Sequence, residues 1–165
     1  MDPLTDVIAQ FLDDICTYLE EKVEALRWVD IEAGQIDAQE GEYPYQFPAC
    51  WADASVEWTN TGVGVEHGEA MLNLRIALDI YDDTHTGSNT RRKALEQYSV
   101  LTDIHKAISL YGNTPHNRMT RVRTTPEQRA DGYKVFNVVY KCDIRDTSAQ
   151  LRSEAAPIKV KISPI

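Results

Sequence analysis

The chain has 165 residues, 42% of them hydrophobic and 26% charged, a composition typical of one globular domain with a real hydrophobic core. Its formal net charge of −9 at pH 7 argues against a surface that binds nucleic-acid phosphates throughout. Three widely spaced cysteines without a CxxC pair argue against a disulfide framework or a zinc site. Cys16 and Cys142 lie in apolar patterns and are interpreted as small buried side chains in a reducing compartment.

The N-terminal segment predicts a helix rather than a targeting signal. It begins MDPLTDVIAQ, which is acidic where a signal peptide is basic, and no apolar run approaches membrane-spanning length, so we expect a soluble protein made in the cytosol. Asp2 is a good N-cap, and an apolar stripe at helical spacing predicts a helix to about Trp28, packed on a sheet. Its solvated face is acidic, with Asp13, Asp14, Glu20, Glu21 and Glu24.

The next region predicts a loop followed by a strand and a turn. Residues 29–46 are polar with glycine and proline, and a short strand is expected around Trp28 to Ile31. The segment PACWADASVEWTN alternates apolar and polar residues, which predicts a strand with Pro48 at its start. The following TGVGVEHGE contains Gly62, Gly64 and Gly68 and is interpreted as a flexible hairpin loop.

The most informative stretch is Glu69 to Asp82, which alternates apolar and polar residues without interruption. Such a period of two predicts a strand with one buried face, and at ~3.3 Å per residue it would reach roughly 45 Å. A small domain with one or two helices cannot cover so long a strand. We therefore expect part of it to project as a hairpin arm or to be covered by another subunit. The apolar residues are Leu72, Leu74, Ile76, Leu78 and Ile80.

The second half repeats the helix–strand–strand order. A helix is expected from about Thr90 to Tyr111, and strands from Asn117 to Thr125 and from Tyr133 to Asp146. The order α-β-β-α-β-β favours an α+β fold with one antiparallel sheet, long hairpins and both helices on the same face. We expect this single domain to span residues 1–147.

Residues 148–165 are expected to form a C-terminal extension. SAQLRSEAAP is interpreted as a linker, and in IKVKISPI the apolar residues Ile158, Val160 and Ile162 alternate with lysines. Three interpretations stay open: an edge strand on its own sheet, an arm that adds to a neighbour's sheet edge, or a disordered terminus.

No cluster of residues predicts a catalytic, cofactor or metal site. The spacing GVGVEHG is not GxGxxG and precedes a strand rather than a helix, so phosphate binding is not expected. His105 falls on the apolar face of its helix, as a half-buried, hydrogen-bonded histidine does. Two groups are candidates for acid–base or metal chemistry, and both are interpreted as solvated loops: Glu66, His67 and Glu69, and Asp82, Asp83 and His85. We expect a protein that is not an enzyme.

Arginines concentrate positive charge on the hairpin after the second helix. Arg121 and Arg123 are expected to share a strand face with Met119, and Arg118 to lie on the other face. They are interpreted first as solvated charges, second as partners of an acidic subunit surface such as the first helix, and third as a nucleic-acid patch. Together with the C-terminal apolar residues, the candidate interface comprises Arg118, Arg121, Arg123, Ile158, Val160 and Ile162.

From Pro3 to Asp146, the chain resembles the tail terminator and tail-completion (neck) proteins of tailed bacteriophages. The resemblance lies in PLTDVIAQFLDDICTYLEEKV, FPACWADASVEW, MLNLRIALDIYDD, RKALEQYSVLTDIHKAISL, NRMTRVRTT and YKVFNVVYKCDIRD, in that order. It implies an α+β subunit of a ring, usually a hexamer, that caps the tail tube and joins it to the head, without enzymatic activity.

The resemblance also implies partners and a location. The partners are further copies of the chain and the tail-tube and head-connector proteins, and the protein ends in the virion after synthesis in the host cytoplasm. DNA passes through the lumen without sequence-specific binding, and an acidic lining repels its phosphates. The alternatives are a head–tail adaptor or stopper, an acidic nucleic-acid mimic that blocks a DNA-handling enzyme, and last a metal-dependent enzyme.

Overall fold

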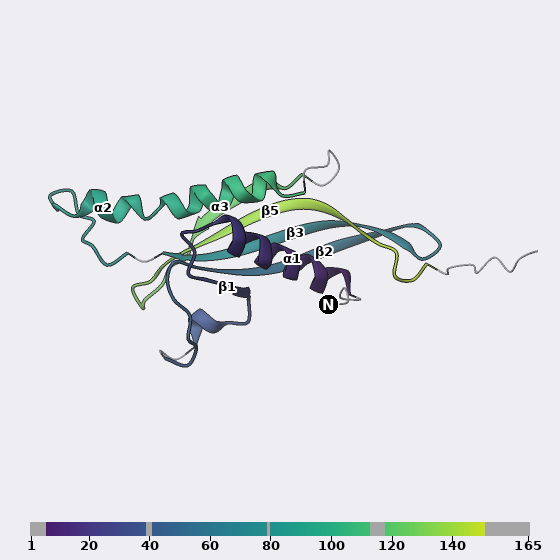
Figure 1. Ribbon diagram of the computed structural model, residues 1–165, viewed down its shortest axis with the longest axis horizontal. Coiled ribbons are helices and arrows are strands. Elements are labelled where there is room, and N and C mark those ends of the chain that lie inside the picture. Colours follow the sequence, from purple (N-terminus) through teal and green to yellow (C-terminus); the bar gives the residue numbers. More distant parts are fainter. Residues whose placement is uncertain (1–5, 39–40, 79, 113–117, 151–165) are drawn as a thin grey trace, which may run out of the picture.

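The computed structural model describes residues 6–38, 41–78, 80–112 and 118–150. Among the helices in these ranges, none has the length and hydrophobicity needed to span a membrane. Helices lie against a five-stranded sheet with the strand order β1-β2-β3-β5-β4 (Figure 1). The strands are β1 (Trp28–Ile31), β2 (Ala49–Gly62), β3 (Val65–Leu78), β4 (Thr120–Pro126) and β5 (Lys134–Asp146). This confirms the predicted α+β class.

The sheet is mixed, and the prediction of a wholly antiparallel sheet is wrong. β1 pairs parallel to β2, whereas every other neighbouring pair is antiparallel. The connection from β1 to β2 contains a 3-10 turn (Gln35–Asp37) and is long enough to return the chain to the starting end of the sheet. Two adjacent strands joined in this way run in the same direction. The short strand expected around Trp28 to Ile31 is confirmed as β1, although the predicted order of six elements left it out.

The first helix, α1 (Val7–Lys22), ends earlier than predicted. Asp6 caps it, because its carboxylate accepts hydrogen bonds from the backbone N–H groups of Ile8 and Ala9 at 3.0 and 2.8 Å. The predicted cap, Asp2, lies outside the described residues. After Lys22 the chain turns toward β1, yet Leu26 still packs on the core, so the apolar spacing overstated the helix length.

The second predicted helix is two helices, α2 (Arg91–Glu96) and α3 (Ser99–Leu110). At the break, the N–H of Tyr98 bonds to the carbonyl of Leu95, three residues back rather than four. The Tyr98 ring meets Phe136 of β5 edge-on, with a centroid distance of 5.4 Å. The apolar spacing runs through this break, so it did not reveal the change in backbone.

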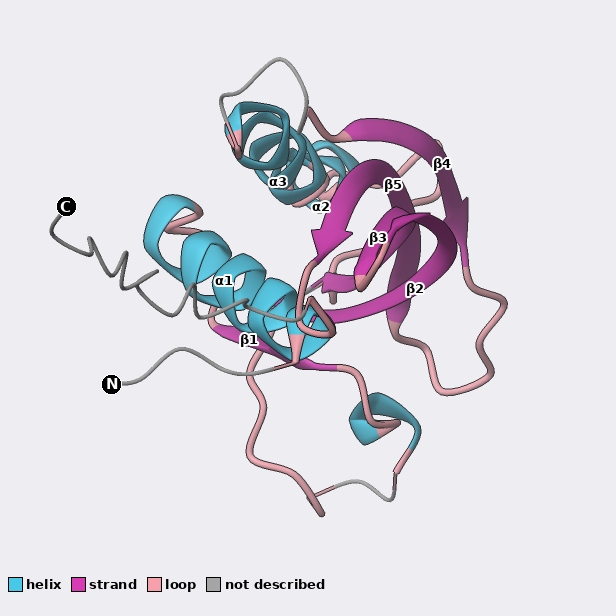
Figure 2. Cartoon of the chain, turned by 90° about the vertical axis from the view of Figure 1, so that its right-hand side faces the viewer, coloured by secondary structure: helices cyan, strands magenta, loops and turns pink. Residues whose placement is uncertain are grey.

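The core lies between the helices and one face of the sheet, as predicted (Figure 2). The even-numbered residues of β3 from Leu72 to Leu78 are buried there, which confirms the predicted alternation over that range. They meet side chains of α1 and α3, among them Ile15, Leu19, Ile104 and Ile108. Cys142 is buried in this core, as predicted, whereas Cys16 is half-buried.

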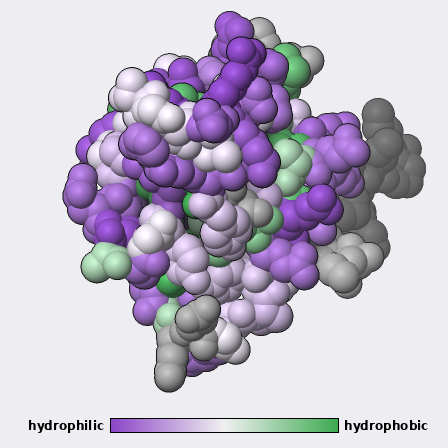
Figure 3. Space-filling model, turned by 90° about the vertical axis from the view of Figure 1, so that its left-hand side faces the viewer, coloured by the Kyte–Doolittle hydropathy of each residue, from purple (hydrophilic) through white to green (hydrophobic). Residues whose placement is uncertain are grey.

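A second apolar cluster covers one end of the other sheet face. Trp51, Ala77 and Val135 are fully buried there beneath the connection between β1 and β2. The Tyr45 ring stands edge-on against Trp51, with a centroid distance of 5.3 Å. Viewed from the end of the molecule where α2 lies, the surface is mainly hydrophilic, and hydrophobic side chains appear in small separate patches (Figure 3).

β2 and β3 form a hairpin that extends past the helices at the other end (Figure 1). β3 starts four residues before the predicted Glu69 and ends at Leu78 rather than Asp82. The turn is only Val63–Gly64, with Gly64 at φ +67°, a conformation that favours glycine. The prediction of a flexible loop over the three glycines is therefore wrong, because Gly62 ends β2 and Gly68 lies inside β3.

Candidate interface surfaces

Strand β4 is one edge of the sheet, and all seven of its residues are exposed. Arg121 lies opposite Tyr140 and Arg123 lies opposite Val139, so Val122 is an extra residue and the strand has a β-bulge. Tyr140 belongs to the core under the helices, whereas Val139 and Arg123 line a groove on the other face.

Met119 is buried in the helical core, on the same side as Arg121. The prediction that both arginines share a face with Met119 is therefore right for Arg121 and wrong for Arg123. The physical reason is the bulge, since one inserted residue reverses the alternation of side chains from that point on.

Arg121 lies near His105 of α3. The Nδ1 atom of His105 is 3.3 Å from the hydroxyl oxygen of Tyr140, and the two rings are stacked. Burial lowers the pKa of His105, and the positive charge of Arg121 lowers it further. The prediction of a half-buried, hydrogen-bonded histidine is confirmed.

Arg123 lines a groove of about 640 Å³ on the sheet face away from the helices. Four strands form this groove, and Asn73 lies in its floor with a buried Oδ1 atom that accepts no hydrogen bond from the described residues. The other lining residues include Asp53, Ser55, Met71, Thr125 and Asn137. Six of its nine lining residues have polar side chains, unlike the residues at the covered end of the same face.

The remaining candidate interface residues are placed only in part. Arg118 precedes β4 and is exposed. Within the described ranges, no carboxylate forms an ion pair with Arg118, Arg121 or Arg123. Ile158, Val160 and Ile162, with the rest of the predicted C-terminal arm from residue 151, lie outside the described residues.

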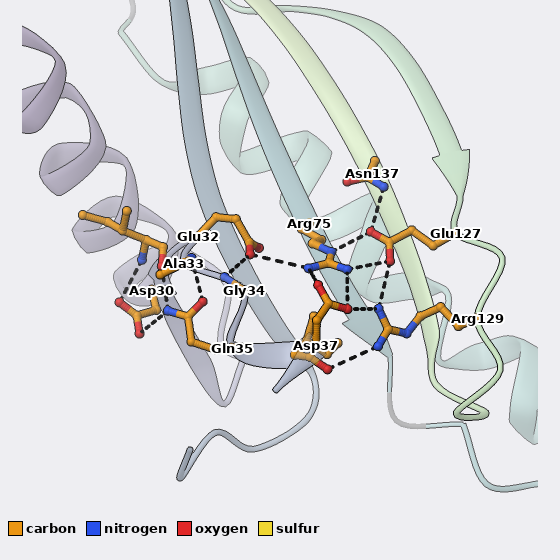
Figure 4. Close-up of polar contacts among 12 residues, drawn as sticks. Asp30, Glu32, Ala33, Gly34, Gln35, Asp37, Arg75, Glu127, Arg129 and Asn137 are labelled. Carbon is orange, nitrogen blue, oxygen red and sulfur yellow. Dashed lines mark hydrogen bonds and ion pairs between the residues drawn. The ribbon is translucent and has the colours of Figure 1, made fainter. Parts of the chain in front are cut away.

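Arg129, which follows β4 in the chain, belongs to a different cluster (Figure 4). Arg75 of β3 donates two hydrogen bonds to Glu127, at 2.6 and 2.9 Å, and two to Asp37, at 2.6 and 3.0 Å. Arg129 donates to Asp37 at 2.7 Å and to Glu127 at 3.1 Å, and it also pairs with Asp131.

This cluster holds the connection after β1 onto the sheet. Hydrogen bonds from Arg75 and Arg129 hold the pKa of Asp37 at about 2, and Arg75 above all lowers the pKa of Glu127. Carboxylates held ionised in this way are poor proton donors at neutral pH, so we assign the cluster a structural role. No sequence pattern indicates this cluster, because its members are far apart in the chain and carry no motif.

Acidic side chains gather at the opposite side of the molecule from β4. The acids of the predicted solvated face of α1 are all exposed, which confirms that prediction. Burial raises the pKa of the Cys16 thiol to about 11, and the charges of Asp30, Asp13 and Glu20 add to this effect. Asp13, Glu20 and Asp30 therefore each lie near Cys16, on the β1 side of the molecule.

Five of the six residues in the two groups considered for chemistry contact a partner side chain at the surface. Within the described ranges, no cluster of three or more His, Cys, Asp or Glu side chains has a geometry that would hold a metal ion. His85 lies 2.7 Å from Asp83, and Lys93 lies 3.1 Å from Asp82. The prediction that His67 and Glu69 lie in a loop is wrong. Both lie in β3, where they contact Asp143 and Lys141 of β5.

Comparison with known proteins leaves these surfaces as the basis for any functional assignment. No protein-family model matches the sequence, and neither does any curated protein.

Proposed function

We propose that the protein is a structural ring component of a tailed bacteriophage: a tail terminator or tail-completion protein at the top of the tail tube or the head–tail junction, with no enzymatic role. The observation that supports this proposal best is the projecting β2–β3 hairpin. It is paired along its whole length, so it is a preformed structural arm rather than a mobile loop.

The distal hairpin exposes apolar side chains that its own helices do not cover. The exposed fraction of Val63 is 84%, and Trp58, which lies outside the core cluster under the helices, is only partly buried. Apolar side chains on a projecting arm gain free energy when another molecule removes them from water. A ring subunit that rests on a tail tube or on its neighbour would supply that contact.

Net charge supports the second part of the proposal, which is a lumen that lets DNA pass. The chain has a formal net charge of −9, and α1 exposes four acids, Asp13, Asp14, Glu20 and Glu21, with one lysine, Lys22, in its last turn. A ring that places acids outside its subunit contacts, such as Asp14 and Glu21, toward its channel would repel phosphates, so that DNA slides through without binding. The C-terminal residues 148–165 would serve as an arm onto the neighbouring copy or the tube.

The first experiment is the solution mass, from light scattering over a concentration series up to about 1 mM. A contact worth even about 4 kcal/mol would be half-formed at that concentration. A closed species of several copies, with a central channel in negative-stain electron microscopy, is the expected result. A strict monomer over the whole series would contradict the ring.

Two other functions are separated by further measurements. A head–tail adaptor or stopper would also form a ring and differs in position, so labelled protein would bind to the head connector rather than to isolated tails. An acidic nucleic-acid mimic is favoured by the acidic face of α1. It would stay a monomer or dimer and bind a basic DNA-handling protein in competition with DNA.

A further inference from the structure

The two edges of the sheet carry opposite charge. We define the acidic edge as Asp13, Glu20 and Asp30, and the basic edge as Arg118, Arg121 and Arg123. Helix α1 packs on β1 and β2, which places Asp13 and Glu20 beside the β1 edge. Strand β4 is at the other end of the strand order, with β2, β3 and β5 between the two edges (Figure 2).

Within the described ranges, both edges lack partners of opposite charge. No ion pair in this part of the chain involves any of the six residues, although Asp30 accepts a hydrogen bond from Gln35. By contrast, Arg75 and Arg129, which lie between the edges, are fully paired. Charges without an ion pair also occur elsewhere in these ranges, as at Glu57 and Arg91, but only the two edges group such charges by sign at opposite ends of the strand order.

We propose that neighbouring copies meet head to tail, with the basic edge of one copy against the acidic edge of the next. The inference rests on the proposed ring and names its subunit contact. Complementary surfaces on opposite sides of one chain give a heterologous contact, and repeating that contact closes a ring when the rotation permits. A two-fold contact between identical edges would instead bring like charges together.

Because of the β-bulge, the basic edge has one arginine on each side of the sheet, and the acidic edge of the neighbour likewise has acids on both sides. Arg121 is on the helical side of the sheet, where the neighbour's Asp13 and Glu20 lie on α1. Arg123 is on the side of the sheet away from the helices. Asp30 is on that side too, because it pairs with Trp51, whose side chain is buried there. Without the bulge, both arginines would lie on the same side of the sheet. Val122, with an exposed fraction of 54%, lies between them and adds an apolar contact.

Reciprocal charge reversal tests this contact. The first variant is Arg121→Glu with Arg123→Glu, and the second is Asp13→Lys with Glu20→Lys. Each alone should raise the concentration for half-assembly by about tenfold or more, because each contact then joins like charges. An equimolar mixture should assemble like the wild type, because every contact in an alternating ring again joins opposite charges. A single chain with all four substitutions should assemble as well, whether the copy number is even or odd.

The matched control is Arg91→Glu with Arg92→Glu on α2, which makes the same change in net charge away from both edges. This control should assemble like the wild type, and circular dichroism should show that every variant is folded. If wild-type protein forms rings and the reversed variants do too, the contact is wrong and the ring stands. If both variants fail and neither the mixture nor the four-substitution chain recovers, the pairing is also wrong. A wild-type protein that never assembles overturns the ring itself.

Discussion

Arg121 and Arg123 are two positions apart on one strand, yet they lie on opposite faces of the sheet. The cause is Val122, which the neighbouring strand β5 leaves unpaired, so that Arg121 is opposite Tyr140 and Arg123 is opposite Val139. The consequence is a different electrostatic environment for each guanidinium. The positive charge of Arg121 lowers the pKa of His105 on the helical side of the sheet, and Arg123 lines the groove on the other face.

The first prediction concerns the pKa of His105. In the wild type it should lie below the ordinary value of 6.5, because burial and then the charge of Arg121 both disfavour the imidazolium. Arg121→Gln should move it upward, and NMR titration of the His105 ring protons would measure the change. Arg123→Gln is the matched control and should leave the titration where it is. Equal shifts in both variants would contradict the bulge.

The second prediction concerns the stability that Arg75 provides. Its side chain has an exposed fraction of 14% and makes two-point hydrogen bonds with Glu127 and Asp37. Arg75→Met should lower the free energy of unfolding by about 1–3 kcal/mol, because it leaves Glu127 without its main partner. Arg75→Lys should recover only part of this loss, because an ammonium cannot make the paired bonds.

Chemical denaturation would measure these changes. The control is Arg92→Met, which breaks a surface pair with Glu96 whose arginine side chain has an exposed fraction of 93%. It should cost at most about 0.5 kcal/mol. An Arg75→Met variant as stable as that control would show that the cluster does not hold the fold.

The third prediction concerns acid. The pKa of Asp37 is about 2 in the folded protein, below its ordinary value of 3.8, and the pKa values of Glu127 and Asp131 are also lowered. A depressed folded-state pKa contributes stability that is present above the unfolded-state pKa and is lost as pH falls toward the folded-state value. The free energy of unfolding should therefore drop between about pH 5 and pH 2.

Urea denaturation at a series of pH values would measure that drop. Arg75→Met should show a smaller drop over the same range, because without the guanidinium the folded-state pKa values of Asp37 and Glu127 return toward normal. A steeper acid dependence in the variant than in the wild type would count against this assignment of the pKa shifts.

The fourth prediction concerns the distal hairpin. A Cβ atom on Gly68 would lie 2.5 Å from Val56 Cγ1 and 2.8 Å from the Trp58 ring. Gly68→Ala should therefore displace Trp58 and lower the free energy of unfolding by about 1–3 kcal/mol, as overpacking does. The same change in a Trp58→Leu background should cost less, because the smaller side chain leaves room. Equal costs in both backgrounds would exclude the clash with Trp58.

The fifth prediction concerns the C-terminal segment. Deleting residues 151–165 should leave the thermal unfolding of the domain unchanged, because the described strands and helices all lie before it. If Ile158, Val160 and Ile162 form an arm onto a neighbour, the deletion should weaken assembly in light scattering. Replacing those three residues with serine in the full-length chain should have the same effect. A truncated protein that assembles normally would remove the arm from the proposal.

Local patterns were enough to predict most of the elements, since each pattern depends on residues close in the chain. The alternation from Leu72 to Leu78 specified a strand with its buried face, and the stripe along α1 specified a helix with an acidic exposed side. The placement of both helices on one face followed from the same patterns. The ends of α1 and the break at Tyr98 did not, because apolar spacing continues through them.

Tertiary structure alone decided how distant segments meet. The sequence by itself determined the α+β class, the long hairpin strands and the two groups of opposite charge. Only pairing across strands decided that β1 is parallel, that Val122 is unpaired, and that Arg75 gathers carboxylates from two loops. These features depend on contacts between residues tens of positions apart, whose free energy appears only once the sheet has formed, and no local period encodes them.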